Sequence, residues 1–425
     1  MFKSILVPWK HTLFAKNSFM YRLVIFIMFV LLVEWYAFQA IKTISKFKWI
    51  QNSYILLTVL FIAYIFYSFS QFDRSIGQNS QTLFTLGLLI TISVPKIFIA
   101  VMLFGEDIVR FFTGVFYWVS PKMGMTTFFP PRVKWLSALA IILAFVPLIA
   151  IVHGILVGKH NYKVIPQTVY FKDLPKEFDG FRITHISDIH VGSLENKAAI
   201  QEAIKMINNQ NSDMILFTGD IVNTHASEMD PWITVFNEIS SPPFGKFSVL
   251  GNHDYGEYIT WPNNQAKDAN FIAIKNIHQK IGFQLLLNEN VSISKGNEEI
   301  KLIGVENWGH NFKKAGDLKL ASEGIAKSDF KILMSHDPSH WEYEVKNHPF
   351  NYHLALSGHT HGMQFGIEIP GVFRWSPVQY VYKQWAGLYE NASRYLYVNR
   401  GFGFHAYPGR VGIWPEITVI TLKKG

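Results

Sequence analysis

The chain contains no cysteine. This absence excludes disulfide bonds, thiolate zinc sites and a cysteine nucleophile, although it leaves the cellular compartment open. Charged residues are also few, at 16% of the 425 residues, where about 25% is usual for a soluble domain. The formal net charge is +8, but no run of Lys and Arg interleaved with aromatics accompanies it, so nucleic acid is not an expected partner. Basic residues beside apolar segments more often face anionic lipid head groups, which favours a membrane.

Long apolar segments dominate the first 160 residues, and each approaches the roughly 20 residues that a helix needs to cross the hydrocarbon core. They are apolar on all faces rather than along one stripe, which favours membrane helices over a buried soluble bundle. A cleavable signal peptide is not expected, because the first segment is long and no small-residue cleavage site follows it. The segments run from about Tyr21 to Ala40, Ile50 to Phe69, Leu83 to Phe104 and Leu136 to Val157.

Polar residues are scarce inside these segments. Glu34 is the one acidic residue well inside a span, and because a carboxylate is expensive there, it either pairs within the bundle or marks a functional position. Apart from Glu34 we find only scattered Ser and Thr, too few for a transporter. Residues 1–160 are therefore predicted to form a membrane domain with four transmembrane helices, and residues 161–425 a second domain outside the bilayer.

The basic residues of the connections indicate an orientation. Connections one and three are basic, whereas connection two is nearly neutral, so the positive-inside rule places one and three in the cytoplasm. The basic N-terminal tail argues the other way. On balance we expect a multi-pass plasma (inner) membrane protein whose second domain is extracytoplasmic. The residues weighed are Lys42, Lys46 and Lys48 in connection one, Asp73 and Arg74 in connection two, Glu106, Asp107, Arg110, Lys122, Arg132 and Lys134 in connection three, and Lys3, Lys10, Lys16 and Arg22 in the tail.

After Gly158 the pattern changes to short apolar runs that alternate with helical segments, which indicates an α/β sheet. A helix is predicted over Glu195–Asn209, and a second one begins with Asp230 as N-cap and Pro231 at the first helical position, leading through Ile239. The predicted strands are Val164–Phe171, Arg182–Ile186, Met214–Thr218, Phe247–Leu250, Lys331–Met334 and His353–Leu356.

Five short motifs follow these strands, each directly after an apolar run. Together they supply enough carboxylate, amide and imidazole groups for two divalent metals, and ligands of open α/β sheets gather beyond the carboxyl ends of the strands. Any one motif is weak, but the five in this order are a strong signal. They are Asp188-Ile189-His190, Gly219-Asp220, Gly251-Asn252-His253-Asp254, Ser335-His336 and Gly358-His359-Thr360-His361.

The motifs divide into two predicted metal sites roughly 3.5–4 Å apart, which need an anionic bridge. Asp220 is the expected bridge. Asp188, His190 and His361 would complete the first site, and Asn252, His336 and His359 the second. Imidazole and carboxylate without thiolate suit Mn, Fe, Zn or Co, and ligand type does not separate these four. The glycines at 219, 251 and 358 let the backbone turn tightly and approach the metals.

Other residues receive catalytic or structural roles. His253, held in one tautomer by Asp254, is expected to protonate the leaving oxygen or to stabilise charge on phosphorus. Arg400, Arg410 and Lys383 are either phosphate contacts or surface charges. Among the remaining histidines, His185 is expected in the core, and His278, His340, His348 and His353 as structural residues. His225, His310 and His405 either line the cleft or are ordinary loop residues, and the loop role is favoured.

The motif series resembles the calcineurin-like metallophosphoesterase superfamily over about Phe181 to Leu422, which implies a β-sandwich flanked by helices. The ending Tyr397-Val-Asn-Arg-Gly-Phe-Gly403, Pro408-Gly-Arg410 and Pro415-Glu-Ile417 is similar to the YkuE-like branch, which includes membrane-associated and exported bacterial phosphoesterases. Where that branch usually has glycine before glutamine, this chain has Met363, which adds a side chain at the rim of the cleft.

These observations predict a membrane-anchored, dinuclear metal-dependent phosphoesterase that attacks its substrate with a metal-bridging hydroxide. The anchor suggests a substrate at the membrane, such as a phospholipid, a lipid pyrophosphate or an envelope precursor. Monoester or diester preference and oligomeric state are not predicted. The alternative is a non-catalytic membrane sensor or adaptor, but such a protein should have lost metal ligands, and here all are retained.

Overall fold

The computed structural model describes residues 8–119, 130–310, 312–369 and 371–425. Lys3 and Lys122, which entered the orientation argument, lie outside these residues. The chain divides into two compact units, here called the helical unit (Met1–Ser70 and Leu88–Val152) and the α/β unit (Gln71–Gly87 and His153–Gly425). The segment from Gln71 to Gly87, which comprises the connection between the second and third membrane helices and the first residues of the third, therefore belongs to the α/β unit.

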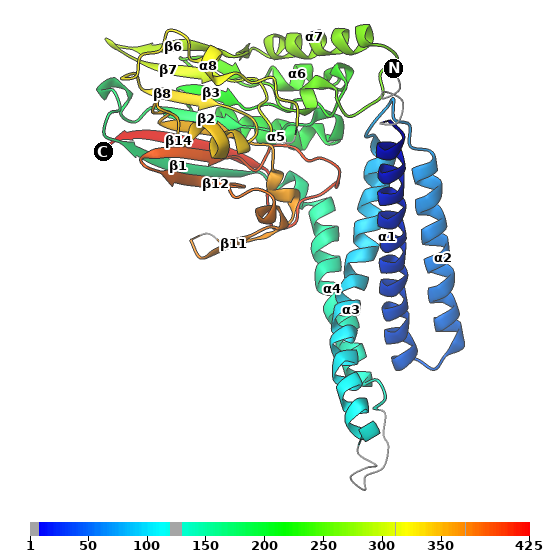
Figure 1. Cartoon of the computed structure of the whole chain (residues 1–425). Coiled ribbons are helices and arrows are strands. Elements are labelled where there is room, and N and C mark those ends of the chain that lie inside the picture. Colours follow the sequence, from blue (N-terminus) through cyan, green and yellow to red (C-terminus); the bar gives the residue numbers. More distant parts are fainter. Residues whose placement is uncertain (1–7, 120–129, 311, 370) are drawn as a thin grey trace, which may run out of the picture. The chain divides into compact units, whose positions relative to one another are not determined.

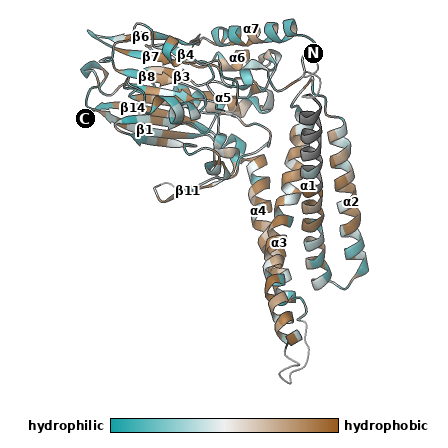
Figure 2. Ribbon diagram, viewed as in Figure 1, coloured by the Kyte–Doolittle hydropathy of each residue, from teal (hydrophilic) through white to brown (hydrophobic). Residues whose placement is uncertain are grey.

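The described residues contain four helices that are long and apolar enough to cross a membrane, as predicted. Many of their residues are hydrophobic (Figure 2), and large side chains such as Val101 and Ile149 are 66% and 64% exposed. A soluble protein would bury such residues, so the exposed faces suit lipid. The helices are α1 (Pro8–Ile44), α2 (Lys48–Ser70), α3 (Ser80–Val119) and α4 (Lys134–Leu156). The ends of α2 and α4 lie within two residues of the predicted ones, whereas α1 and α3 extend well beyond at least one predicted end.

Glu34 pairs within the bundle. The Lys96 ammonium on α3 lies 2.7 Å from Glu34 Oε1, and Tyr54 and Thr58 on α2 donate hydrogen bonds to Glu34 Oε2 at 2.7 and 3.3 Å. The expectation that Glu34, Ser and Thr are the only polar residues of the spans is wrong, because it overlooked Lys96. This ion pair satisfies a carboxylate that lipid alone would leave without a partner.

The α/β unit contains two six-stranded sheets packed face to face. One has the order β1-β14-β2-β3-β4-β5 and the other β12-β13-β9-β8-β7-β6. The first sheet consists of β1 (Lys163–Phe171), β14 (Glu416–Lys424), β2 (Arg182–Ile186), β3 (Met214–Phe217), β4 (Lys246–Ser248) and β5 (Gln284–Leu285). The second consists of β12 (Gly387–Asn391), β13 (Arg394–Val398), β9 (Leu354–Ser357), β8 (Lys331–Met334), β7 (Glu298–Gly304) and β6 (Glu289–Lys295).

The hydrophobic core explains why the sheets stack. Leu216 of β3 and Leu302 and Leu356 of the second sheet are fully buried in one cluster between the sheets. Separate clusters cover the outer faces, where helices pack. The predicted sandwich flanked by helices is confirmed. The helices are α5 (Lys197–Asn208), α6 (Ile233–Phe236), α7 (Asn264–Lys280) and α8 (Leu318–Ala321).

One predicted helix start is wrong. Asp230 ends a short 3-10 helix, where its N–H bonds to the Ser227 carbonyl, and α6 begins only at Ile233. It stops at Phe236 rather than continuing through Ile239, because the chain then turns toward the Pro242-Pro243 pair, before which α conformation is disfavoured.

Candidate metal centre

The five motifs meet at one end of the sandwich. β2, β3 and β4 run parallel, as do β8 and β9, so the loops after these strands emerge at the same edge of each sheet. The loops are joined by backbone bonds, such as Asp188 N–H to the Gly219 carbonyl at 2.9 Å and Gly358 N–H to the His336 carbonyl at 2.9 Å. The seven predicted metal ligands are thereby brought together.

The side-chain donor atoms form two adjacent groups. In the first, His361 Nε2 lies 3.4 Å from Asp188 Oδ1, and His190 belongs to the same group. In the second, His336 Nε2 lies 3.1 Å from Asp220 Oδ2, and His359 is the third member. Ligands about 2.1 Å from one ion are separated by roughly 3.0–3.4 Å, so both groups fit a divalent cation.

Asp220 and Asn252 lie where the assigned roles require. Asp220 Oδ2, already 3.1 Å from His336 Nε2, is also 3.6 Å from His190 Nε2 of the first group. Asn252 Oδ1 lies 2.8 Å from His359 Nδ1, which in turn is 3.3 Å from His336 Nε2. This donor set suits two neighbouring ions with Asp220 between them.

Hydrogen bonds on the outer side of the imidazoles orient them. His336 Nδ1 lies 2.7 Å from the Thr218 carbonyl, and His190 Nδ1 lies 3.1 Å from Asn223 Oδ1. His359 uses the opposite nitrogen, because its Nε2 bonds to the Tyr382 hydroxyl at 2.7 Å. The other nitrogen of His336 and of His190 faces Asp220, and that of His359 faces Asn252 and His336, so each ring has one nitrogen directed at the site, as metal-ligating histidines require.

The electrostatics of the metal-free site call for cations. Burial raises the pKa of Asp188 to about 6, and the Asp220 carboxylate adds to the rise. Burial would also raise the pKa of Asp220, but His336 and His253 hold it well below its usual value. Burial opposes a charge on His336, yet Asp220 and Asp188 raise its pKa to about 10. Burial lowers the pKa of His190 to about 3, which keeps it neutral for ligation.

Five of the seven predicted ligands have a left-handed backbone. The φ angles of Asp188, His190, Asp220, His359 and His361 are 54, 48, 60, 70 and 50°. Such conformations cost a non-glycine residue about 1 kcal/mol or more. Strain of this kind clusters at functional sites, where it aims side chains that a regular strand would point elsewhere.

Two glycines are required by close approach. A Cβ atom on Gly358 would lie 1.8 Å from Ser187 Oγ and 2.2 Å from Asp188 Oδ2. A Cβ atom on Gly251 would lie 2.2 Å from Asp220 Oδ1. Any side chain at these positions would displace a predicted ligand.

The structure separates His253 from Asp254. His253 Nδ1 bonds to the Asn223 carbonyl at 2.8 Å, and its backbone N–H donates to Asp220 Oδ1 at 2.8 Å. Asp254 instead accepts the N–H groups of Gly251, Asp220 and Ile221 at 2.8–2.9 Å, and burial raises its pKa to about 7. The predicted Asp254–His253 contact is wrong, because neighbours on this 3-10 turn point apart. Asp254 instead holds together the loops that follow β3 and β4.

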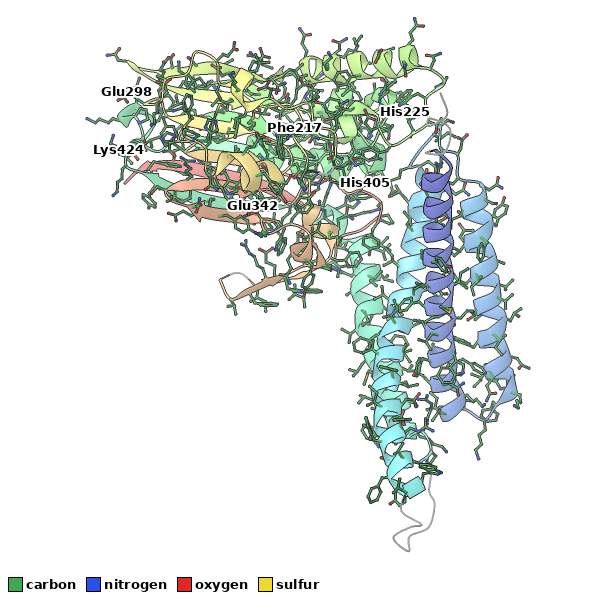
Figure 3. The ribbon with its side chains drawn as sticks, viewed as in Figure 1. Phe217, His225, Glu298, Glu342, His405 and Lys424 are labelled. Atoms are coloured by element: carbon green, nitrogen blue, oxygen red, sulfur yellow. The ribbon has the colours of Figure 1, made fainter. Side chains whose placement is uncertain are left out.

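Sequence reasoning missed several site residues. The His405 ring stacks on His190 at 4.9 Å and lies 4.5 Å from the ring of His253, and these three could form a further cation group. His405 lies at the end of the α/β unit opposite Lys424 (Figure 3). The favoured assignment of His405 as an ordinary loop residue is therefore wrong, and its alternative, a residue that lines the cleft, fits these contacts. Asn223 and Tyr382 were also missed, although Asn223 follows Asp220 by only three positions.

Several other assignments are now settled. His185 is buried and bonds to the Thr218 hydroxyl at 2.9 Å, so its core role is confirmed. Arg400 is neither a phosphate contact nor a surface charge, since it is buried in ion pairs with Glu416 and Glu368.

Arg410 and Lys383 complete the set of basic candidates. Arg410 is fully buried, donates to the Gly401 and Gly403 carbonyls, and lies 3.4 Å from His361 Nδ1. Burial lowers its pKa to about 10. Arg410 therefore supports the His361 loop from within, whereas Lys383 is an exposed charge paired with Glu342 at 3.2 Å.

Comparison with known proteins identifies relatives of both units. Residues 181–363 match the family described as calcineurin-like phosphoesterase, and residues 20–159 match one described as a probable calcineurin-like phosphoesterase transmembrane domain. The uncharacterized metallophosphoesterase YkuE of Bacillus subtilis is 31% identical over 270 residues, which cover 62% of this chain and 86% of YkuE.

Two further relatives are more distant. A transmembrane protein with metallophosphoesterase domain of Danio rerio is 26% identical over 277 residues, 64% of this chain and 60% of that protein. The UDP-2,3-diacylglucosamine pyrophosphatase LpxG of Chlamydia muridarum is 26% identical over 281 residues, 54% of this chain and 81% of that protein. With its four membrane helices and its ordered motifs, this chain is a multi-pass membrane protein that belongs to the YkuE-like branch of the calcineurin-like metallophosphoesterases and is a metal-dependent phosphoric ester hydrolase.

Proposed function

We propose that this protein hydrolyses a phosphodiester or pyrophosphate bond of a lipid-linked substrate at the membrane surface, with two divalent cations in the site. The observation that carries the two-ion proposal is the position of Asp220 Oδ2, within 3.6 Å of His190 and 3.1 Å of His336 from separate donor groups. The cations supply Lewis acidity, which activates water and neutralises charge on the phosphate. The proposed ligands are Asp188, His190, Asp220, Asn252, His336, His359 and His361.

His253 is proposed as the residue that delivers a proton to the leaving oxygen. Its Nδ1–H is committed to the Asn223 carbonyl at 2.8 Å, so Nε2 is the nitrogen that exchanges a proton with substrate. The neutral His405 ring packs beside it, since burial holds the pKa of His405 well below its ordinary value. The two imidazoles together line the leaving-group side of the site.

The proposal of a lipid-linked substrate is supported by the residues next to two candidate membrane spans, which contact loops of the site. Gln78, two residues before α3, accepts a hydrogen bond from the Ala406 N–H at 2.8 Å and donates one to Ser193 at 2.9 Å. Gly154 near the end of α4 accepts the Arg410 N–H at 3.1 Å, and Arg410 lies 3.4 Å from His361 Nδ1. Residues that adjoin two candidate spans therefore support the loops of the site. The name of the chlamydial relative specifies an acylated pyrophosphate, which is the same chemical class.

We further propose that the α/β unit lies outside the cytoplasm. The connection between α2 and α3 is part of the α/β unit, so the two share a side, and the basic connections lie on the other. A membrane-impermeant maleimide should label a cysteine placed at exposed Phe72 in intact cells. A cysteine in place of Lys46 should react only after lysis. The opposite pattern would reverse the orientation.

Hydrolysis is tested with the purified full chain. We expect Mn²⁺-dependent release of nitrophenol from a chromogenic phosphodiester and of phosphorus from lipid extracts. Asp220→Asn should abolish both, whereas Asp268→Asn, at an exposed position on α7, should retain parental turnover. Absence of turnover with every divalent metal in well-folded protein would favour a non-catalytic sensor instead.

A further inference from the structure

An apolar hairpin projects from the α/β unit (Figure 1). It consists of β10 (Ile367–Ile369) and β11 (Phe373–Trp375), which pair antiparallel. Ile367 opposes Trp375 and Ile369 opposes Phe373, so these side chains share one face. Ile367, Ile369 and Phe373 are 54%, 52% and 52% exposed, and Val372 in the turn is 80% exposed.

The opposite face of the hairpin is fixed to the α/β unit. Glu368 opposes Arg374 on this face. Glu368 pairs with the buried Arg400, and Arg374 donates to the Ala386 carbonyl and packs over the Tyr389 ring at 5.0 Å. The polar side of this hairpin is thus satisfied, whereas Ile367, Ile369 and Phe373 on its apolar side are each more than half exposed. Such an exposed apolar patch on a fixed element marks an interaction surface.

The root of the hairpin adjoins the end of a membrane span. Gly366 N–H bonds to the Val411 carbonyl at 2.9 Å, and the neighbouring Arg410 N–H bonds to the Gly154 carbonyl near the end of α4 at 3.1 Å. Each three-residue strand extends about 10 Å from that root, and the interfacial region of a bilayer is roughly 5–8 Å thick on each side. A hairpin of this length, rooted beside Gly154, is long enough to span the interfacial region.

We propose that β10–β11, continued by Tyr380 and Val381, inserts its apolar face into the boundary between lipid head groups and acyl chains. Tyr380 and Val381 follow β11 and are 78% and 69% exposed. Aromatic residues such as Phe373 suit this boundary. Met363, at the rim of the metal centre and 48% exposed, begins the same stretch of chain. The hairpin would hold the metal centre facing the bilayer surface, and it does so whether or not the proposed hydrolysis takes place.

Spin labelling of the full chain in lipid nanodiscs tests this proposal. Because the chain contains no native cysteine, only the introduced cysteine is labelled. A nitroxide on Val372→Cys should be accessible to oxygen, and its accessibility to a water-soluble nickel chelate should be roughly tenfold lower than that of a nitroxide in the aqueous phase, as expected for a probe in the lipid interface. The matched control is Asn297→Cys, in the exposed turn between β6 and β7, which should stay fully accessible to nickel.

Other occupants of this face give different results. Nickel accessibility at Val372→Cys equal to that at Asn297→Cys would overturn the proposal. Dipolar broadening between labels on two chains, with low accessibility to both oxygen and nickel, would show a second copy on this face and would overturn it too.

A functional arm separates this inference from the hydrolase proposal. Val372→Glu with Phe373→Glu should lower turnover of phosphorus-containing lipid in nanodiscs by roughly tenfold, because acidic groups are expelled from the interface. Turnover of the water-soluble chromogenic diester should change less than about twofold. Equal losses on both substrates would contradict a membrane role for the hairpin, and absence of turnover in the parent would refute the hydrolase proposal while leaving the spin-label result standing.

Discussion

Replacement of Lys96 by methionine should destabilise the helical unit by leaving Glu34 without its counter-charge. Lys96 Nζ lies 2.7 and 2.9 Å from the two Glu34 oxygens, and both side chains are about 15% exposed. At 2.7 Å and an effective dielectric constant near 20, the Coulomb attraction is about 6 kcal/mol before desolvation is subtracted. Removing one partner of a buried pair typically costs about 3–5 kcal/mol.

Two neighbouring hydroxyl groups reduce the loss of stability expected for Lys96→Met. Tyr54 and Thr58 continue to donate to Glu34 in the variant, so we expect the free energy of unfolding of Lys96→Met to fall by about 3 kcal/mol, at the low end of that range. Glu34→Gln combined with Lys96→Met removes both charges and should recover all but about 1 kcal/mol, since a neutral amide keeps hydrogen bonds with the hydroxyls.

Equilibrium unfolding in mixed micelles, followed by tryptophan fluorescence, measures these differences. Lys48→Met, at an exposed lysine at the start of α2, is the matched control and should change stability by less than about 0.5 kcal/mol. The reasoning is refuted if Lys96→Met is as stable as the parent, or if the double variant is no more stable than Lys96→Met alone.

Three further predictions concern the metal centre. Gly358→Ala places a methyl group 2.2 Å from Asp188 Oδ2, so Mn²⁺ affinity, measured by metal analysis after dialysis, should fall by about 10–100-fold. The control Gly105→Ala, whose methyl group would have nothing within 4 Å, should leave the affinity unchanged. Equal affinities of the two variants would show that the loop adjusts to the added methyl group. His405→Phe keeps the ring stack but loses the nitrogens, and kcat should fall roughly tenfold at constant metal content; unchanged kcat would reduce His405 to a packing role. The pKa of His336 is raised to about 10 in the metal-free chain, so a proton occupies this proposed ligand at neutral pH and must leave when a metal binds. Mn²⁺ affinity should therefore rise about tenfold per pH unit between pH 6 and 8. Calorimetry that finds no pH dependence would contradict this.

The sequence predicted which side chains gather at the candidate metal centre because each follows a strand whose apolar run is visible without alignment. Parallel strands place their carboxyl ends together, so residues such as Asp188 and His359 converge although 171 positions separate them. The spans were equally plain, since uniform hydropathy needs no knowledge of packing.

What escaped prediction depends on contacts rather than on pattern. Lys96 interrupts an apolar run, and its partnership with Glu34 requires the packing of α3 against α1. His405 reaches His190 across more than 200 positions, with no local motif to announce it. Asp254 looks like a partner of His253 because they are adjacent, but the turn directs its carboxylate to backbone N–H groups.

Crystals of the full chain soaked in Mn²⁺ and measured for anomalous scattering test the central claim most directly. The account predicts two peaks roughly 3.5–4 Å apart, both in contact with Asp220, one completed by Asp188, His190 and His361 and the other by Asn252, His336 and His359. A single peak, or a pair bound by a different set of side chains, would contradict it.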